Sequence, residues 1–401
     1  MAMIKKPVNG MKDILPAEMA VRMYVINLIR ETYAEFGFSS IETPVVEHIE
    51  NLLSKQGGEN EKLIFKIMKR GEKLKLDSAR GEEDLADSGL RYDLTLPLAR
   101  YYANHAGELP SPFKALQIGP VFRADRPQRG RYRQFTQCDI DVLGDPSYIS
   151  EIELILATTT VLGRLDFKGF TIRINDRKIL KNMAAKAGFK EADCEKVFII
   201  LDKMDKIGWE GVKEELLADF PAETVEAYLA QFREGTELSS LMEDSPVARI
   251  IAAVEAVRTA DFQIVFDPTL VRGMGYYTGP IFEIAMDEFG GSVGGGGRYD
   301  EMIGRFTGQN TPAVGFSIGF ERIVMLLMEK GFQAPNSRKK MAFLIEKKMP
   351  DERLTEVFRE AEKERAGGKA VAILVMKKNK KFQKEQLAQE GYEDIREFFA
   401  R

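Results

Sequence analysis

The first apolar pattern along the chain predicts an amphipathic helix over residues 16–36. Pro16 stands where a helix can begin, and Gly37 follows the last turn. The apolar residues between them recur three or four positions apart, so that a helix places them on one face: Val21, Val25, Leu28 and Ile29. The pattern therefore indicates one long helix near the N-terminus.

Strand patterns follow this helix. Residues 39–46 alternate like a strand that Pro44 interrupts. Residues 63–76 alternate apolar and basic side chains, which predicts a hairpin that turns at residues 70–71. The acidic and polar stretch 77–88 is expected to form a surface loop.

The second half of the chain changes from strand to helix and back. Ile172 and Ile174 indicate a strand, after which residues 177–258 hold few glycines and many Glu, Lys, Leu and Ala residues. Strand patterns return in three stretches: 262–266, 276–285 and 314–318. We expect one antiparallel-sheet domain made of residues 1–176 and 259–330, with residues 177–258 as an inserted helical module.

The C-terminal part is set off by a linker over residues 331–340, which contains glycine, proline and asparagine. Residues 341–401 then alternate strand and helix patterns, in this order: 342–345, 351–365, 370–376 and 380–389. This alternation predicts a small C-terminal α/β module. The overall expectation is an α+β protein.

Composition narrows the class of protein. The chain has 401 residues, enough for two or three domains, and its 44% hydrophobic and 30% charged residues are typical of soluble globular proteins. A membrane-spanning run and the apolar core of a signal peptide are both missing from the sequence. Two cysteines, Cys138 and Cys194, are too few for a disulfide framework or a four-cysteine zinc site. We therefore expect a cytoplasmic protein.

Charge and histidine content limit the chemistry. The net charge is −4, so a nucleic-acid partner would have to be bound by local basic patches. The two histidines, His48 and His105, argue against a histidine-based catalytic triad or metal cluster.

The densest basic segment is residues 122–135. It contains five arginines: Arg123, Arg126, Arg129, Arg131 and Arg133. Pro127 and Gly130 mark a turn between two strands. Guanidinium groups fixed on a hairpin suit triphosphate oxygens, and an aromatic ring such as that of Phe135 can stack on a base. On spacing alone, a solvated basic hairpin with surface ion pairs is an equally good interpretation.

Two further segments carry carboxylates. They are residues 90–95 and residues 137–141. On a strand, Gln137, Asp139 and Asp141 share one face, where they would suit a ligand that carries an amine and an imidazole. A polar sheet face wetted by solvent explains the same alternation, and locally it is the stronger interpretation.

Glycines are concentrated in residues 270–279 and in Gly294 to Gly297. They permit close approach of backbone to a ligand or to another strand. No Gly-Lys-Ser or Gly-Lys-Thr follows, which excludes a phosphate-binding P-loop, and no βαβ pattern supports a dinucleotide fingerprint. Residues 315–323 run from a strand into a helix. Taken singly, these segments support a polyanion and polar small-molecule site on a sheet.

Together the segments resemble the histidyl-tRNA synthetase family over about residues 8–330. Residues 37–44 look like motif 1 of class II synthetases, which builds a dimer interface. Residues 122–144 look like motif 2, and residues 315–322 look like motif 3. The Arg-Gly-Met-Gly-Tyr-Tyr-Thr-Gly and Gly-Gly-Arg-Tyr-Asp blocks are similar to the two histidine-specific signatures of the family.

The resemblance implies a fold and a reaction. The fold is the class II antiparallel sheet flanked by helices, with a helical insertion and a C-terminal anticodon-binding-like module. The reaction is ATP-dependent activation of L-histidine to histidyl-adenylate, followed by transfer to the 3′ end of histidine tRNA by a homodimer, with Mg²⁺ accompanying ATP. The alternative is a histidine-binding paralogue of the kind that regulates ATP phosphoribosyltransferase. That paralogue generally loses the catalytic arginine and the anticodon domain.

The resemblance also implies roles on the nucleotide side. Arg272 and Arg123 are the implied catalytic residues, with Arg272 at the α-phosphate. Arg123, Arg131 and Arg322 hold the ATP phosphates, while Phe135 and Arg322 sandwich adenine. The presence of Arg123, Arg272 and Arg322 favours the enzyme over the regulatory paralogue. The ligands of Mg²⁺ are left unassigned.

The implied histidine pocket has two parts. One part holds the α-amino group: Asp93, Thr95 and Gln137. The other surrounds the imidazole: Asp141, Tyr277 and Tyr299. Some neighbouring residues are expected to be structural, with Tyr276, Phe282 and Cys138 in the core and Asp300 and Glu321 in ion pairs.

Two departures from the family stand out. Gly275 occupies a position where the family usually has aspartate, which puts the ordering of that block in question. The C-terminal module is shorter than the family's anticodon-binding domain. Its lysines could touch RNA phosphates or form a solvated run: Lys377, Lys378, Lys380 and Lys381. The helical insertion is assigned to the acceptor stem of the tRNA.

Overall fold

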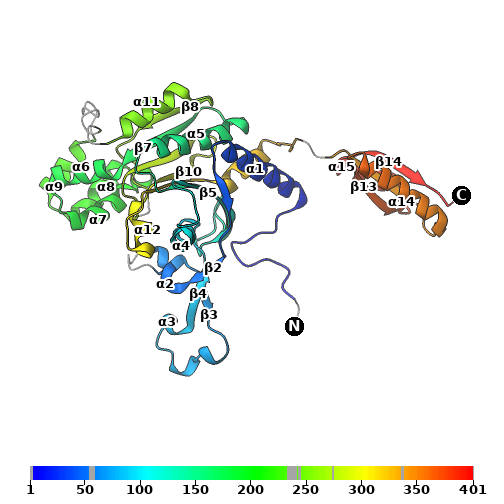
Figure 1. The fold of residues 1–401 in the computed structure, drawn as a ribbon, viewed down its shortest axis with the longest axis horizontal. Coiled ribbons are helices and arrows are strands. Elements are labelled where there is room, and N and C mark those ends of the chain that lie inside the picture. The colour runs from blue at the N-terminus through cyan, green and yellow to red at the C-terminus, as the bar shows by residue number, and fades with distance from the viewer. Residues whose placement is uncertain are drawn as a thin grey trace. The chain divides into compact units, whose positions relative to one another are not determined.

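The computed structural model describes residues 3–53, 59–232, 242, 245–272, 275–335 and 338–400. The chain divides into two compact units, Met1–Phe332 and Gln333–Arg401 (Figure 1). The first unit holds every strand and helix that positions the site described below. None of the helices in the described ranges is both long and apolar enough to cross a membrane.

The first unit is built on an eight-stranded sheet with the order β1-β5-β6-β11-β10-β9-β7-β8. Neighbouring strands from β5 to β7 in this order run antiparallel, whereas β1 and β8 join the two edges in parallel. The strands are β1 Ser39–Ile41, β5 Phe113–Phe122, β6 Gln134–Leu143, β7 Phe170–Asp176, β8 Phe262–Phe266, β9 Pro280–Met286, β10 Gly291–Arg298 and β11 Ala313–Ile318. The antiparallel sheet expected from the sequence is confirmed, with parallel strands at its edges.

Helices cover this sheet and bury its apolar side chains. They are α1 Pro16–Glu35, α4 Thr95–His105, α5 Ile149–Arg164, α12 Asp300–Thr307 and α13 Phe320–Glu329. Helix α1 begins at Pro16, as expected, and buries Val25 and Ile29 completely against α5 and α13. The apolar side chains of β6, Ile140 among them, pack in the core with these helices. The polar side chains that alternate with them are therefore left for the opposite face of the sheet.

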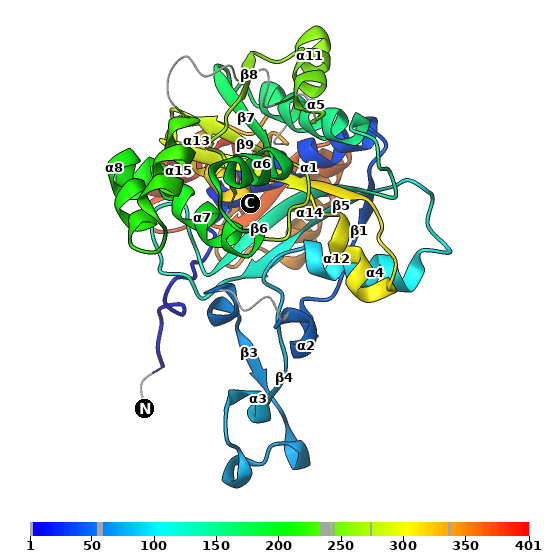
Figure 2. The ribbon, with the colours of Figure 1, turned by 90° about the vertical axis from the view of Figure 1, so that its left-hand side faces the viewer.

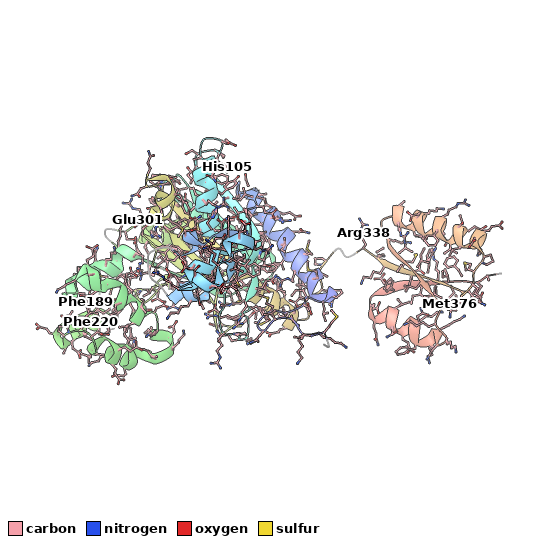
Figure 3. The ribbon with its side chains drawn as sticks, turned by 90° about the horizontal axis from the view of Figure 1, so that it is seen from below. His105, Phe189, Phe220, Glu301, Arg338 and Met376 are labelled. Atoms are coloured by element: carbon pink, nitrogen blue, oxygen red, sulfur yellow. The ribbon has the colours of Figure 1, made fainter. Side chains whose placement is uncertain are left out.

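The helical module lies between two strands that are neighbours in the sheet. The chain leaves the sheet at the end of β7, forms helices, and returns as β8 beside β7. These helices are α6 Arg177–Ala187, α7 Cys194–Leu201, α8 Met204–Leu217, α9 Ala222–Ala230 and α11 Val247–Val257, with the short η4 Glu191–Asp193. Phe189 and Phe220, labelled in Figure 3, pack edge to face at 5.0 Å between ring centres. Helices were predicted in this stretch, and the described part of it confirms them.

The prediction for residues 63–76 is wrong in part. They contain one strand, β3 Lys66–Met68, followed by the 3-10 turns η2 Gly71–Lys73 and η3 Leu76–Ser78. The partner of β3 is β4 Ala86–Leu90, which follows the short helix α3 Glu82–Leu85 and begins within the stretch 77–88 that was expected to be a loop. Alternation identifies a strand but carries no information about its partner. Here β4 lies between β3 and β2 Val46–His48.

These strands form a projecting arm. Figures 1 and 2 show β3, β4 and α3 extending away from the large sheet. Two short helical segments, α2 Ile49–Leu52 and η1 Glu59–Leu63, lie along the chain between β2 and β3. The strand predicted over residues 39–46 is divided near Pro44 into β1 of the large sheet and β2 of the arm, because proline cannot continue a strand ladder.

The second unit is a three-stranded parallel sheet with the order β13-β12-β14. Its elements are β12 Lys340–Ile345, α14 Asp351–Ala366, β13 Ala370–Val375, α15 Lys380–Gln389 and β14 Tyr392–Phe398. Phe343 is buried on one face of the sheet and Leu344 on the other, so both faces carry a small core. The predicted strands and helices are confirmed. Residues 336–337 of the predicted linker lie outside the described residues.

Candidate active site

One cavity of about 510 Å³ opens on the polar face of the eight-stranded sheet. It is bounded by the loop between β5 and β6, by the strands β6, β10 and β11, and by the segment that leads into β9. All eleven residues to which the sequence assigned a role line this cavity: Asp93, Thr95, Arg123, Arg131, Phe135, Gln137, Asp141, Arg272, Tyr277, Tyr299 and Arg322. Stretches of chain 180 residues apart thus meet in one place.

Arg123 enters the cavity at the end of β5. Its Nε donates a hydrogen bond to the carbonyl oxygen of Tyr92 at 3.1 Å. Its guanidinium lies 4.2 Å from the ring centre of Tyr92 and 5.1 Å from that of Phe135. These contacts hold the guanidinium plane in a fixed orientation, as recognition of phosphate oxygens requires.

Arg272 is held in an unusual backbone conformation. Its φ of 61° lies in the left-handed region, which residues other than glycine rarely adopt. Its Nη1 donates to Glu283 Oε2 at 3.0 Å. Burial opposes the charge of Arg272, but Tyr277 and Glu283 outweigh it and raise the pKa of the guanidinium. The surrounding structure therefore keeps a fully charged arginine in a strained but fixed position.

Arg322, near the start of α13, completes the set of cations. Its Nη1 donates to the carbonyl oxygen of Ser292, and its guanidinium lies 4.9 Å from the ring centre of Phe289. Burial lowers the pKa of Arg322, and repulsion from Arg131 and Arg272 lowers it further. Arg322 is thus close enough to Arg131 and Arg272 to be repelled by both of them. A polyanion placed among them would relieve this repulsion.

Three buried carboxyl groups occupy the cavity beside the arginines. Burial raises the pKa of each: that of Asp93 moderately, that of Asp139 to about 7, and that of Asp141 well above its usual value. Repulsion among them adds to the effect for Asp139 and Asp141. Tyr299 Oη donates to Asp141 at 2.5 Å, and Ser317 Oγ donates to Asp139 at 2.5 Å. A cationic ligand group would offset the energetic cost of these buried charges.

Strand register explains how these groups meet. In β11, Ser317 lies opposite Asp139 of β6, and Gly315 lies opposite Asp141. A Cβ on Gly315 would overlap the Asp141 carboxylate, so the strand has to be bare at that point for the side chain to fit.

Gln137 leaves an unused acceptor in the site. Its Nε2 donates to Asp139 at 3.2 Å and to Ser317 Oγ at 3.4 Å. Its Oε1 is buried and has no hydrogen-bond partner within the described part of the chain. Since buried acceptors are almost always paired, this oxygen points to a donor on a ligand.

Several cavity residues had no assigned role. Asp139 was recognised as sharing a strand face with Gln137, and its register opposite Ser317 gives it a place in the site. Glu283 is a carboxylate within the apolar run of β9, and that exception was the signal that could have identified it. Tyr276 was expected in the core, but its ring lines the cavity, 4.8 Å from that of Tyr277. The ring also packs against a core cluster, so the expectation is met in part, because tyrosine can present its ring to both core and cavity.

The other structural expectations are confirmed. Phe282 is buried and stacks on Phe316. Cys138 is buried in the main core. Glu321 pairs with Arg22 at 2.6 Å, and Asp300 pairs with Arg298 at 3.3 Å. Residues 273–274, which supply part of the glycine pattern, lie outside the described residues.

The described side chains provide no ready-made metal site. Within the described ranges, no three His, Cys, Asp or Glu side chains gather closely enough to hold a metal ion. Magnesium usually keeps several waters and binds substrate phosphates together with one or two carboxylates. Glu283 lines the cavity and is a carboxylate of the kind that such an ion uses.

Comparisons with known proteins agree with this geometry. A family model described as histidyl-tRNA synthetase matches residues 10–323. Histidine–tRNA ligase of Leifsonia xyli subsp. xyli is 46% identical over 357 residues, which cover 82% of each chain. Histidine–tRNA ligase of Christiangramia forsetii is 39% identical over 350 residues, or 80% of this chain and 76% of that one.

Solved structures show the same fold. The histidyl-tRNA synthetase of Nostoc sp. PCC 7120 is 27% identical, with a TM-score of 0.76 over 97% of this chain and 90% of that one. A Bacillus halodurans protein described as an ATP phosphoribosyltransferase regulatory subunit/histidyl-tRNA synthetase is 20% identical, with a TM-score of 0.75 over both whole chains. That second likeness shows the fold alone. By the family match and the sequence relatives, the chain belongs to the histidyl-tRNA synthetase family.

Proposed function

We propose that this protein activates L-histidine with ATP and transfers it to the 3′ end of histidine tRNA. The names of the sequence relatives support this function. The observation that carries it is the meeting of Arg123, Arg272 and Arg322 with three buried carboxyl groups in one cavity. The regulatory paralogue is not favoured, since the relatives at 39–46% identity are named as ligases.

The arginines provide the nucleotide side of the reaction. Arg123 and Arg131 bind phosphate oxygens, and Arg322 and Phe135 sandwich the adenine. A carboxylate oxygen of histidine attacks the α-phosphorus of ATP, and the bond from that phosphorus to the pyrophosphate oxygen breaks. Arg272 stabilises the negative charge that develops on the α-phosphoryl oxygens, because its N–H donors are fixed before the reaction begins.

The carboxylates and tyrosines provide the amino-acid side. Asp93, Thr95 and the unpaired Oε1 of Gln137 accept hydrogen bonds from the α-ammonium group of histidine. Asp141, Tyr277 and Tyr299 surround the imidazole: Asp141 Oδ1, fixed by Tyr299 Oη, accepts from a ring N–H. Positioning the amino-acid carboxylate in line with the α-phosphate accounts for much of the rate enhancement.

Partners complete the proposal. Bound together with ATP, Mg²⁺ would neutralise phosphate charge, and Glu283 could supply it with one oxygen. Two copies associate through residues 37–44, which contain the edge strand β1. Sedimentation of the purified protein should therefore give the mass of a dimer.

The exposed lysines after β13 contact tRNA phosphates, and the protein acts in the cytoplasm.

Histidine-dependent exchange of pyrophosphate into ATP tests the activation step. The wild-type protein should show exchange, and Arg272→Ala should lower kcat at least about a hundredfold because a charge-stabilising donor is lost. Arg129→Ala is the matched control, since Arg129 lies in the loop between β5 and β6 in an exposed pair with Glu329. Exchange that survives Arg272→Ala, or an absence of exchange in wild type with histidine binding retained, would reject the proposal.

A further inference from the structure

The segment that carries Arg272 and Tyr277 passes close to the helical module at Gly275. A Cβ placed on Gly275 would lie 3.4 Å from Glu195 Oε2, which belongs to the first turn of α7. The sequence has no carboxylate at position 275, where the resemblance led us to expect one. The structure instead brings a carboxylate to the same spot from another part of the chain.

The other oxygen of this carboxylate binds a buried cation. Glu195 Oε1 accepts a hydrogen bond from Arg177 Nη2 at 2.5 Å. The Arg177 side chain is 3% exposed, whereas that of Glu195 is 54% exposed. Arg177 Nε is buried without a hydrogen-bond partner within the described residues. A buried guanidinium with one carboxylate partner depends strongly on that partner.

Arg177 also holds the far end of the same segment. Its backbone N–H donates to the carbonyl oxygen of Gly279 at 3.0 Å. Its guanidinium lies 4.7 Å from the ring centre of Phe198 in α7, which fixes it against the helical module. Arg177 therefore contacts the segment at Gly279, and the Glu195 carboxylate lies close to it at Gly275, on the other side of Tyr277.

We propose that Glu195 is a positioning residue that ties the helical module to the active site and supplies from α7 the carboxylate that Gly275 lacks. The inference rests on the proposed function, because the segment matters through Arg272 and Tyr277. It gives the first two helices of the module, α6 and α7 (Figures 1 and 2), a part in the activation step itself. Glu195 acts through the segment and touches no substrate.

A carboxylate swap provides the test. The φ of Gly275 lies outside the left-handed region, so an L side chain fits there, and its position faces Glu195. Four proteins are compared in the exchange assay: wild type, Glu195→Ala, Gly275→Asp and the double variant. The control is Glu215→Ala, which removes a half-exposed carboxylate paired with Lys203 in the same module.

We expect Glu195→Ala to lower kcat/KM for histidine about tenfold, because small displacements of a reacting group are costly, and to change KM for ATP less than about twofold. Gly275→Asp should lower activity in the wild-type background, where two carboxylates would compete for one guanidinium. In the Glu195→Ala background it should instead raise activity at least about threefold. Glu215→Ala should behave as wild type.

The sign reversal of Gly275→Asp is the decisive result. An equal effect in both backgrounds, or a Glu195→Ala variant as active as Glu215→Ala, would overturn the inference. If Glu195→Ala does not fold, Glu195→Gln takes its place in the same comparison. If wild type shows no exchange, the proposed function fails, and the four proteins are compared by calorimetric histidine binding. If Gly275→Asp changes the histidine affinity in opposite directions in the two backgrounds, the role of Glu195 is upheld. If it does not, that role is rejected.

Discussion

At the scale of single residues, the site combines a group of arginines with carboxyl groups whose pKa values are raised by burial. Asp139 shows this most clearly, because its pKa is raised to about 7 from the ordinary value of 3.8. The cause is burial, with repulsion from Asp93 in addition. A group whose pKa is raised by folding makes the folded state more stable at low pH and less stable as the pH rises toward that value.

We therefore expect Asp139→Asn to stabilise the ligand-free protein. The gain in the free energy of unfolding should be about 2 kcal/mol larger at pH 8 than at pH 5.5. Between these two pH values, the cost of ionising Asp139 in the folded wild-type protein grows by the equivalent of about one and a half pKa units. Urea unfolding of the wild-type and Asp139→Asn proteins at the two pH values measures this gain. The control is Asp145→Asn: hydrogen bonds from Ser150 and Ser147 outweigh burial and lower the pKa of Asp145, so this change should destabilise the protein at both pH values. A pH-independent gain for Asp139→Asn would contradict the argument.

The hydrogen bond from Tyr299 to Asp141 makes a second prediction. Tyr299→Phe removes a donor from a buried carboxyl group while keeping the ring. KM for histidine in the exchange assay should rise about tenfold, with KM for ATP nearly unchanged, because the affected groups surround the imidazole. Equal changes in both constants would show that the hydroxyl supports the whole site and not the imidazole pocket.

At the scale of elements, the strand β10 forms the floor of the cavity because it is almost bare of side chains. A Cβ on Gly296 would overlap the carbonyl oxygen of Gly315 in the neighbouring strand β11. Backbone has nowhere to move in the middle of an eight-stranded sheet, since both neighbours of β10 are paired to it. The run of glycines is thus a requirement of strand packing as well as of ligand access.

Gly296→Ala should accordingly lower the free energy of unfolding by more than about 2 kcal/mol, as overpacking of a core does. Denaturant titration followed by circular dichroism measures this change. Gly107→Ala is the control, because a Cβ at Gly107 would meet nothing within 4 Å. Equal stability of the two variants would show that the sheet adjusts to the added carbon.

At the scale of the whole molecule, we propose that the second unit adds tRNA contacts to the activation site of the first. Every residue that lines the cavity belongs to Met1–Phe332. In the second unit, the carboxyl ends of the parallel strands β12 and β13 are followed by exposed lysines: Lys347, Lys348, Lys377 and Lys378. Neighbouring parallel strands end at the same edge, so these charges form one basic edge that suits phosphates.

Replacement of Lys377 and Lys378 by glutamine should therefore raise KM for tRNA in histidine charging and weaken its dependence on salt concentration. Exchange of pyrophosphate into ATP should remain at the wild-type rate, because the cavity is untouched. Lys168→Gln is the control, since it removes an exposed lysine of the other unit that lies outside the helical insertion. If KM for tRNA and its salt dependence were unchanged, the proposed contact between the basic edge and tRNA would be rejected.

Local structure follows from the amino-acid pattern, whereas the site residues were identified through the resemblance to a known family. Periodicity predicted α1 and the strand and helix order of the second unit, because burial of one face leaves a direct record in the sequence. The motifs selected eleven residues that all line one cavity. Three other features arise only when the chain is folded: the partner of β3, the meeting of Asp139 with Ser317, and the approach of the Glu195 carboxylate to Gly275. Register and long-range contacts depend on how distant segments pack, and no local pattern encodes that.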